Sequence, residues 1–276
     1  MIDRSTQLLA PEPTVLILGG FLTSPLLYRR MARRLLDRGA AGVVVAPVWT
    51  PDWLLTGFLG LRRVISRAGH ALIRAGELSS SSAASRGTPV LLVGHSAGGL
   101  VARILTSPVP FEGIPLAGHR RIGAIVTLGT PHQTADRAFV GGRVGYFAAA
   151  FAERAVPGAT FAPEVGYVAV GSRAIVGGAA GTGRGRLADP FYHQLHPAPD
   201  GSPIEGDGLV PLDCTDLSGA RRVVLEEILH GQMSFRPWYG SPEALDVWWP
   251  VALEAWHDAL AAREAAASFD RPRLRP

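Results

Sequence analysis

The segment from Val90 to Leu100 places a serine where nucleophilic chemistry can occur. Four apolar residues, Val90–Val93, predict a strand covered on both faces, and a helical pattern follows Ser96. Gly94 and Gly98 allow a sharp turn, because larger side chains there would collide with neighbouring backbone. The hydroxyl would then stand near the free N–H groups of a helix N-terminus, which can stabilise an oxyanion. This arrangement predicts a nucleophile elbow; a glycine-rich turn with an incidental serine is the alternative.

A serine hydroxyl is a weak nucleophile at neutral pH and needs a positioned base, whose tautomer an acidic partner must fix. The second half of the chain offers candidates for both roles. Candidate bases are His193, His196, His230 and His257, and candidate acids are Glu205, Asp207, Asp213 and Asp216. His257 lies inside a predicted helix beside Trp256, which favours a packed or surface histidine.

Strands and helices alternate along the chain, which predicts an α/β fold with a mostly parallel sheet and helices on both faces. Active residues of such sheets gather at the carboxyl ends of the strands. The predicted strands are Val15–Leu18, Val43–Val45, Val90–Val93, Ile122–Leu128, Val165–Val170 and Arg222–Leu225. The predicted helices are Pro25–Arg38, Leu59–Glu77, Gly98–Thr106, Val144–Arg154 and a last helix over 242–267.

We expect a single domain over residues 1–276, with its core at about 14–231. Two stretches, 134–163 and 172–206, fit this core poorly, and loops of that length are usually functional or mobile. Surface decoration is the alternative for both. The serine-rich run 79–87 predicts a polar connector on the surface.

The elbow, read as Gly94-His95-Ser96-Ala97-Gly98, resembles that of the α/β-hydrolase superfamily, and more narrowly of its lipases and esterases. Residues 206–211, Gly-Asp-Gly-Leu-Val-Pro, resemble the acid loop of bacterial triacylglycerol lipases. The family order is serine, acid, histidine, and the resemblance therefore implies Asp207 as the acid. It also implies His230, just beyond the last strand, as the base.

The same resemblance implies an oxyanion hole formed by the backbone N–H groups of Ala97 and Phe21. Gly19 replaces the histidine that relatives often carry in this loop, so a side chain that steadies the loop is missing. The family carries lids in insertions such as 134–163 and 172–206. Further candidates for contact with substrate are Leu22, Trp49, Trp53, His95 and His132.

Composition limits the classes of function. The 276 residues include 47% hydrophobic residues, which permit a large core, and carry a formal charge of only +4. We expect no nucleic-acid partner, because no basic patch interleaved with aromatic residues is present. Neither a signal peptide nor a membrane span is evident, so a cytoplasmic protein is expected, with peripheral contact to a lipid surface as an option.

We expect no cofactor and no metal. Cys214 is the single cysteine, predicted to be inert or mildly exposed, and His193 with His196 and Asp189 is weak evidence for a metal site. The resemblance implies an enzyme of lipid metabolism that hydrolyses lipid or other apolar acyl esters through Ser96, His230 and Asp207. Acyl transfer, thioester hydrolysis, amide or peptide hydrolysis and a non-catalytic binding role are the alternatives.

Overall fold

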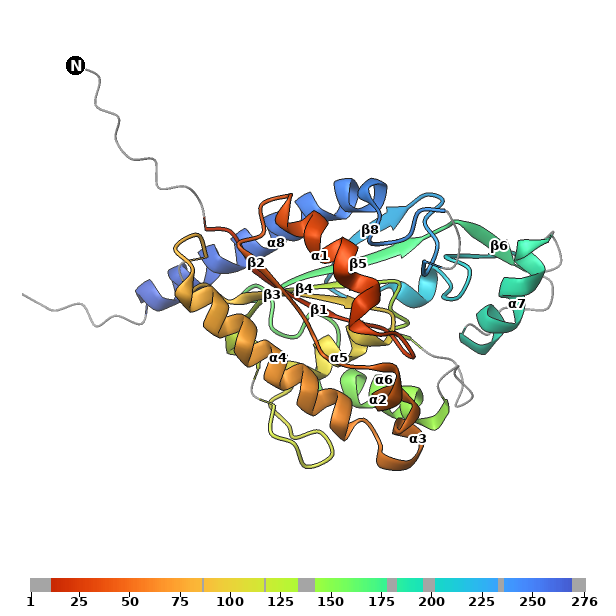
Figure 1. Ribbon diagram of the computed structural model, residues 1–276, viewed down its shortest axis with the longest axis horizontal. Helices are drawn as coiled ribbons and strands as arrows, with labels where there is room; N and C mark the ends of the chain where they lie inside the picture. The colour runs from red at the N-terminus through yellow and green to blue at the C-terminus, as the bar shows by residue number, and fades with distance from the viewer. Residues whose placement is uncertain are drawn as a thin grey trace, which may run out of the picture.

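One six-stranded sheet forms the centre of the protein (Figure 1). The computed structural model describes residues 11–85, 87–116, 118–133, 142–177, 183–195, 202–232 and 236–269. The strand order is β2-β1-β3-β4-β5-β8, and every neighbouring pair is parallel. The strands are β1 (Thr14–Leu18), β2 (Gly42–Val45), β3 (Val90–His95), β4 (Ile122–Leu128), β5 (Gly166–Ser172) and β8 (Arg221–Leu225). The predicted α/β class and its six-stranded parallel sheet are confirmed.

Helices cover both faces of this sheet, because alternate residues of each strand point to opposite sides. Leu91 and Val93 of β3 share one apolar cluster with Trp248, whereas Leu92 shares the other with Leu100. Helices α1 and α8 lie on the first face and α4, α5 and α6 on the second (Figure 1). The helices are α1 (Arg29–Leu36), α2 (Thr50–Leu54), α3 (Thr56–Leu59), α4 (Arg62–Ser81), α5 (Ala97–Leu105), α6 (Gly142–Ala155), α7 (Arg184–Leu195) and α8 (Pro242–Phe269), with short 3₁₀ turns η1 (Pro25–Tyr28), η2 (His119–Arg121) and η3 (Asp213–Thr215).

The structure corrects two local predictions around α4. The helix begins at Arg62 rather than Leu59, because Gly60 adopts a left-handed φ of 63° and separates α3 from it. Most described residues of the predicted connector 79–87 are exposed, as expected, but α4 extends to Ser81 and two serines of this stretch, Ser79 and Ser85, are buried. The Ser79 hydroxyl donates to the Thr88 carbonyl (2.7 Å), and the Ser85 hydroxyl donates to the Ser79 carbonyl (2.6 Å). Serine side chains that bond to nearby carbonyls favour turns over continued helix.

The second predicted insertion, 172–206, has more structure than its composition suggests. The antiparallel pair β6 (Ile175–Gly177) and β7 (Ile204–Gly206) leads out to helix α7 and back. Figure 1 shows this unit beyond the end of the main sheet. Tyr192 of α7 is fully buried, and its hydroxyl accepts the Gly208 N–H at 2.8 Å. The insertion therefore supports the loop that follows β7.

Two further predicted segments differ in detail. Residues 25–38 form the 3₁₀ turn η1 followed by α1, not one helix. Part of the stretch 134–163 lies outside the described residues, and its remainder contains α6 close to the predicted helix. Among the described residues, no helix has the length and apolar character that crossing a bilayer requires.

The side chain of Arg263 fastens α8 to the amino-terminal edge of β4. Its guanidinium donates to the carbonyls of Glu164 (2.6 Å), Arg120 (2.9 Å), His119 (3.1 Å) and Ile122 (2.7 Å). Arg263→Ala should lower the free energy of unfolding by about 2 kcal/mol, measured by urea denaturation. Arg173→Ala, which removes an exposed ion pair with Glu226, is the control and should cost less than about 1 kcal/mol. Equal costs for the two variants would contradict this assignment.

Candidate active site

Ser96 occupies the strained turn between β3 and α5. Its backbone has φ 54° and ψ −127°, a conformation that non-glycine residues rarely adopt. As predicted, the neighbouring glycines leave no room for a side chain. A Cβ on Gly94 would lie 2.5 Å from the Gly99 Cα, and one on Gly98 would lie 2.2 Å from the Leu18 carbonyl oxygen. Close packing of β3, α5 and β1 therefore fixes the position from which the serine projects.

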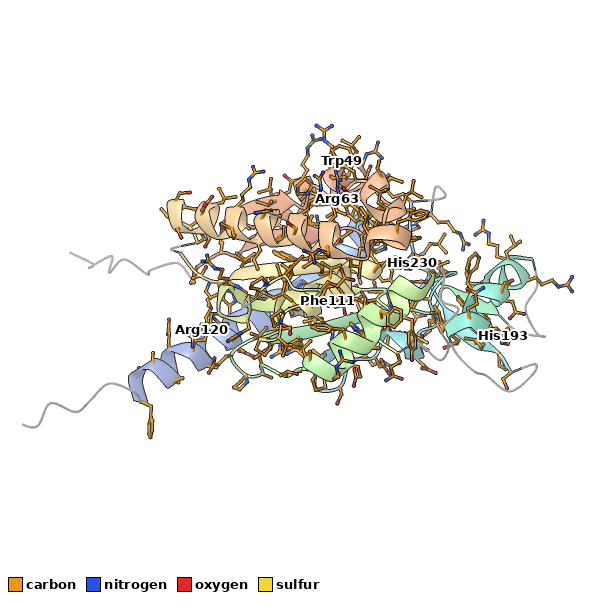
Figure 2. All side chains as sticks on the ribbon, turned by 90° about the horizontal axis from the view of Figure 1, so that it is seen from below. Trp49, Arg63, Phe111, Arg120, His193 and His230 are labelled. Atoms are coloured by element: carbon orange, nitrogen blue, oxygen red, sulfur yellow. The ribbon has the colours of Figure 1, made fainter. Side chains whose placement is uncertain are left out.

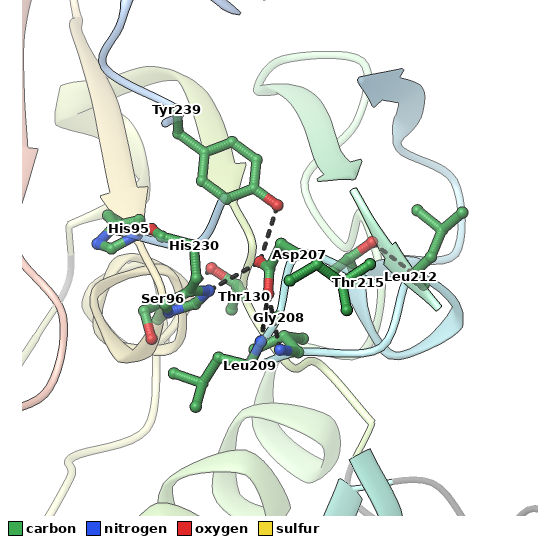
Figure 3. Close-up of polar contacts among 12 residues, drawn as sticks. His95, Ser96, Thr130, Asp207, Gly208, Leu209, Leu212, Thr215, His230 and Tyr239 are labelled. Carbon is green, nitrogen blue, oxygen red and sulfur yellow. Dashed lines mark hydrogen bonds and ion pairs between the residues drawn. The ribbon is translucent and has the colours of Figure 1, made fainter. Parts of the chain in front are cut away.

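The carboxylate of Asp207 lies beside His230 and is almost fully buried (1% exposed). Its Oδ2 accepts hydrogen bonds from His230 Nδ1 (2.7 Å) and from the Tyr239 hydroxyl (2.9 Å). Its Oδ1 accepts from the backbone N–H groups of Leu209 (3.0 Å) and Val210 (2.7 Å). Figure 3 shows these donors converging on the carboxylate, with the imidazole between Asp207 and Ser96. The structure thus brings together the three residues predicted as nucleophile, base and acid.

Electrostatics keep the Asp207 side chain ionised. Burial alone would raise the pKa of this carboxyl, but the His230 imidazole and the N–H groups of Val210 and Leu209 outweigh burial and lower it. An ionised carboxylate only accepts hydrogen bonds, so Nδ1 of His230 must carry a proton. In the neutral ring, Nε2 then holds a lone pair that can accept a proton from Ser96.

Two backbone N–H groups are free near the serine. Neither the Phe21 nor the Ala97 N–H has an acceptor within the part of the chain that the structure describes. The loop after β1 approaches the elbow closely, since a Cβ on Gly20 would lie 2.8 Å from the Ser96 Cβ. Unpaired donors at this place suit the predicted oxyanion hole.

The other predicted contact residues occupy different environments. Leu22 and Trp49 are exposed, as residues at an entrance would be. Trp53 is buried and packs edge-on against Phe21, so it lies behind the loop after β1. This environment fits a packing role better than contact with substrate.

His95 and His132 are both buried and hydrogen-bonded to protein groups. The His132 ring contacts the Thr127 hydroxyl through Nε2 (3.0 Å) and the buried guanidinium of Arg103 through Nδ1 (3.3 Å). Burial and the nearby guanidinium lower the pKa of His132 well below its ordinary value, so this ring is neutral. Through its two ring contacts, His132 anchors the loop after β4. The same residue also lines a cavity of about 400 Å³ beside α6.

The described rival acids and histidines are exposed or have partners other than Ser96 and His230. Asp213 and Asp216 pair with Arg222, and Glu205 is exposed. His257 Nε2 contacts the Pro11 carbonyl oxygen, and His193, on the outlying α7 unit, pairs with Asp189 (Figure 2).

His196 falls outside the described residues. Within the described ranges, no group of three or more His, Cys, Asp or Glu side chains could hold a metal ion. Cys214 is buried rather than mildly exposed, and burial raises its pKa to about 12.

The Thr130 hydroxyl, in the loop after β4 that also carries His132, donates to the Ser96 carbonyl at 2.8 Å. Three tyrosines that sequence reasoning missed also shape this site. Tyr239 donates to Asp207, and the Tyr192 hydroxyl accepts the Gly208 N–H. Tyr28, whose hydroxyl accepts the Gly20 N–H at 2.9 Å, steadies the loop after β1. Their spacing in the sequence carries no signal, because each reaches the site only through the tertiary fold.

The lowered pKa of Asp207 predicts a dependence of stability on pH. The unfolded chain binds this proton more tightly, so the stabilisation is complete above the ordinary carboxyl range. It begins to be lost as pH falls into that range and disappears only below the lowered pKa of the folded protein. Between about pH 6 and about pH 3.5, the wild type should therefore lose more unfolding free energy than Asp207→Asn. Urea denaturation at both pH values measures the difference. Asp213→Asn, at an exposed site, should behave like the wild type; an equal loss in Asp207→Asn would contradict the prediction.

Comparison with known proteins supports this architecture. The family model described as PGAP1-like alpha/beta domain matches residues 70–155, which include β3, Ser96 and α5. The mature lipase BlEst2 of Bacillus licheniformis superposes with a TM-score of 0.59 at 16% identity, over 90% of this chain and 94% of the lipase. Its propeptide form superposes with a TM-score of 0.54 at 16% identity, over 82% of this chain and 50% of that one. No curated protein sequence matches significantly. The structural likenesses establish the α/β-hydrolase fold, as in these lipase structures.

Proposed function

We propose that this α/β-hydrolase-fold protein is a serine hydrolase of carboxylic esters that acts on lipid or other apolar acyl esters. The observation that carries the proposal is the buried Asp207–His230 pair, joined at 2.7 Å, with the His230 ring next to Ser96 in Figure 3 and Ser96 in a strained turn. The likeness of the fold to a lipase of Bacillus licheniformis adds support. A serine next to a histidine that a carboxylate orients is the arrangement that activates a hydroxyl for acyl transfer through a covalent intermediate.

In the first half of the reaction, the Ser96 hydroxyl attacks the ester carbonyl while Nε2 of His230 takes its proton. Asp207 stabilises the imidazolium that forms and holds the ring by its Nδ1–H. The N–H groups of Phe21 and Ala97 bind the negative charge on the tetrahedral intermediate. His230 then returns the proton to the departing alcohol, leaving an acyl group on Ser96.

In the second half, His230 removes a proton from a water molecule, which attacks the acyl carbonyl. The same N–H groups bind the second tetrahedral intermediate, and the proton on His230 passes to the Ser96 oxygen as the acid leaves. The cycle consumes one ester and one water molecule and returns Ser96, His230 and Asp207 to their starting states.

An exposed apolar rim around the site favours an apolar acyl substrate. Its members, exposed on the loop after β1, on η1 and on α2–α3, are Leu22, Leu26, Leu27, Trp49, Leu54 and Phe58. Two hydrogen bonds place these segments beside the catalytic loops: Thr50 donates to the Leu22 carbonyl (3.2 Å), and Gln232 donates to the Leu27 carbonyl (3.1 Å). Clustered exposed apolar residues are typical of surfaces that contact lipid or partners. The apolar rim would therefore meet acyl chains or a lipid surface.

Hydrolysis of p-nitrophenyl esters of increasing chain length tests this function. Ser96→Ala should lower kcat/KM by at least about 10⁴-fold, and Asp207→Asn by about 10³- to 10⁴-fold. The asparagine amide would donate to Nδ1 of His230, so Nε2 would carry the proton and could not accept one from Ser96. Rates that rise with chain length would match the apolar rim.

Asp213→Asn is the matched control, because this carboxylate is exposed and pairs only weakly with Arg222 (3.8 Å). It should keep wild-type activity. Substantial hydrolysis that survives Ser96→Ala would overturn the proposed mechanism. Negligible hydrolysis with rapid transfer of acyl groups to added alcohols, or with cleavage of thioesters, would assign the same triad to acyl transfer or thioester hydrolysis.

A further inference from the structure

We infer that Tyr28 and His95 form a hydrogen-bonded bridge that positions the oxyanion loop and the His230 loop on either side of Ser96. This inference rests on the proposed function and makes both residues positioning residues, because neither acts on substrate directly. The bridge runs from the Gly20 N–H through Tyr28 and His95 to the His230 carbonyl.

Each proton in this Tyr28–His95 bridge has one allowed place. His95 Nε2 lies 2.7 Å from the His230 carbonyl oxygen, which can only accept, so Nε2 must carry the proton. His95 Nδ1 is then an acceptor, and the Tyr28 hydroxyl 2.9 Å away must donate to it. The Tyr28 oxygen in turn accepts the Gly20 N–H at 2.9 Å. Thr23 Oγ1 also lies 3.3 Å from the Tyr28 hydroxyl, farther than His95 Nδ1, and its own proton goes to the Gly20 carbonyl at 2.7 Å.

Burial keeps the bridge in this single state. Tyr28 is 1% exposed and His95 is 4% exposed. Burial, with the neighbouring His230, lowers the pKa of His95 to about 3, and burial raises the pKa of Tyr28 to about 12. Both side chains therefore stay neutral while the enzyme turns over, and the direction of donation along the bridge does not change.

The bridge links the segments that carry a proposed oxyanion donor, the nucleophile and the base. Gly20 precedes Phe21, whose N–H is a proposed oxyanion donor, and His95 directly precedes Ser96. Figure 3 shows His95 next to the His230 ring, and the two ring centroids are 4.9 Å apart. If the loop that carries an oxyanion donor shifts by a fraction of an ångström, its hydrogen bond to the oxyanion weakens. A fixed link between the two loops therefore keeps the donor where it can stabilise the transition state.

The bridge also accounts for the glycine at position 19. A Cβ there would lie 2.7 Å from the Tyr28 ring and 2.8 Å from the Thr23 hydroxyl. The tyrosine therefore occupies the space that a side chain at position 19 would need. From η1, its hydroxyl supports the loop by accepting the Gly20 N–H.

Steady-state kinetics of Tyr28→Phe and His95→Gln test the positioning role. Each variant should lose about tenfold to hundredfold in kcat, less than the loss of an oxyanion donor itself, with KM changed less than about threefold. Because both changes cut the same bridge, the double variant should be no slower than the slower single variant. Inhibition by an alkyl boronic acid, which forms a tetrahedral adduct on serine, should weaken in parallel with kcat.

Tyr167→Phe is the matched control. Tyr167 is also buried, and its hydroxyl also accepts a backbone N–H, that of Phe161 at 3.4 Å, but it does not contact the site. This variant should lose stability and keep kcat. If Tyr28→Phe resembles it, with kcat and boronic acid affinity unchanged, the positioning role is overturned while the proposed function stands.

Nitrogen-15 NMR of histidine-labelled wild type tests the bridge without relying on activity. Its His95 signals, identified by their loss in His95→Gln, should report a neutral ring protonated at Nε2 from about pH 5 to 8. A ring protonated at Nδ1, or one that titrates in this range, would overturn the bridge. Equal rates of ester hydrolysis by the wild type and Ser96→Ala would instead overturn the proposed function.

Discussion

The candidate active site depends on one buried negative charge, the carboxylate of Asp207, which holds the surrounding loops in place through its hydrogen bonds. A buried carboxylate is stable only when donors surround it, since leaving such a charge unpaired costs several kcal/mol or more. Here four donors come from three segments: the loop after β7, the loop after β8 and the residues just before α8. Satisfying one carboxylate therefore fixes the loops that carry Asp207 and His230, and orients the imidazole at the same time.

The parallel sheet positions Ser96, which lies on the other side of the His230 ring from Asp207. β3 ends at the elbow, and backbone contacts too close for any side chain lock Ser96 against β1 and α5. The Tyr28–His95 bridge joins this rigid serine to the loops on both sides, and Tyr192 supports the acid loop from the outlying α7 unit. Strain at Ser96 can persist because these surroundings hold it from several directions.

Local patterns in the sequence predicted the features that depend on local chemistry. The sheet and the elbow were predictable because their residue types directly reflect where they lie. The apolar runs of β1, β3 and β4 are buried, and the glycines around Ser96 lie where no side chain fits. The supporting tyrosines were not, because Tyr28 and Tyr239 lie on different elements and meet their partners only after folding. The serine-rich run at the end of α4 is mostly exposed, as its composition suggests, but Ser79 and Ser85 are buried, with hydroxyls that bond to carbonyls of the same turn.

The most direct test of the account is covalent labelling by an alkyl phosphonate ester, followed by mass spectrometry of the digested protein. An activated serine beside an oxyanion hole displaces the leaving group and keeps the phosphonyl group. The account predicts one adduct per chain, on the peptide that contains Ser96, and no adduct in Ser96→Ala. An adduct on another residue, or none on the folded wild type, would contradict the assignment of Ser96 as the nucleophile.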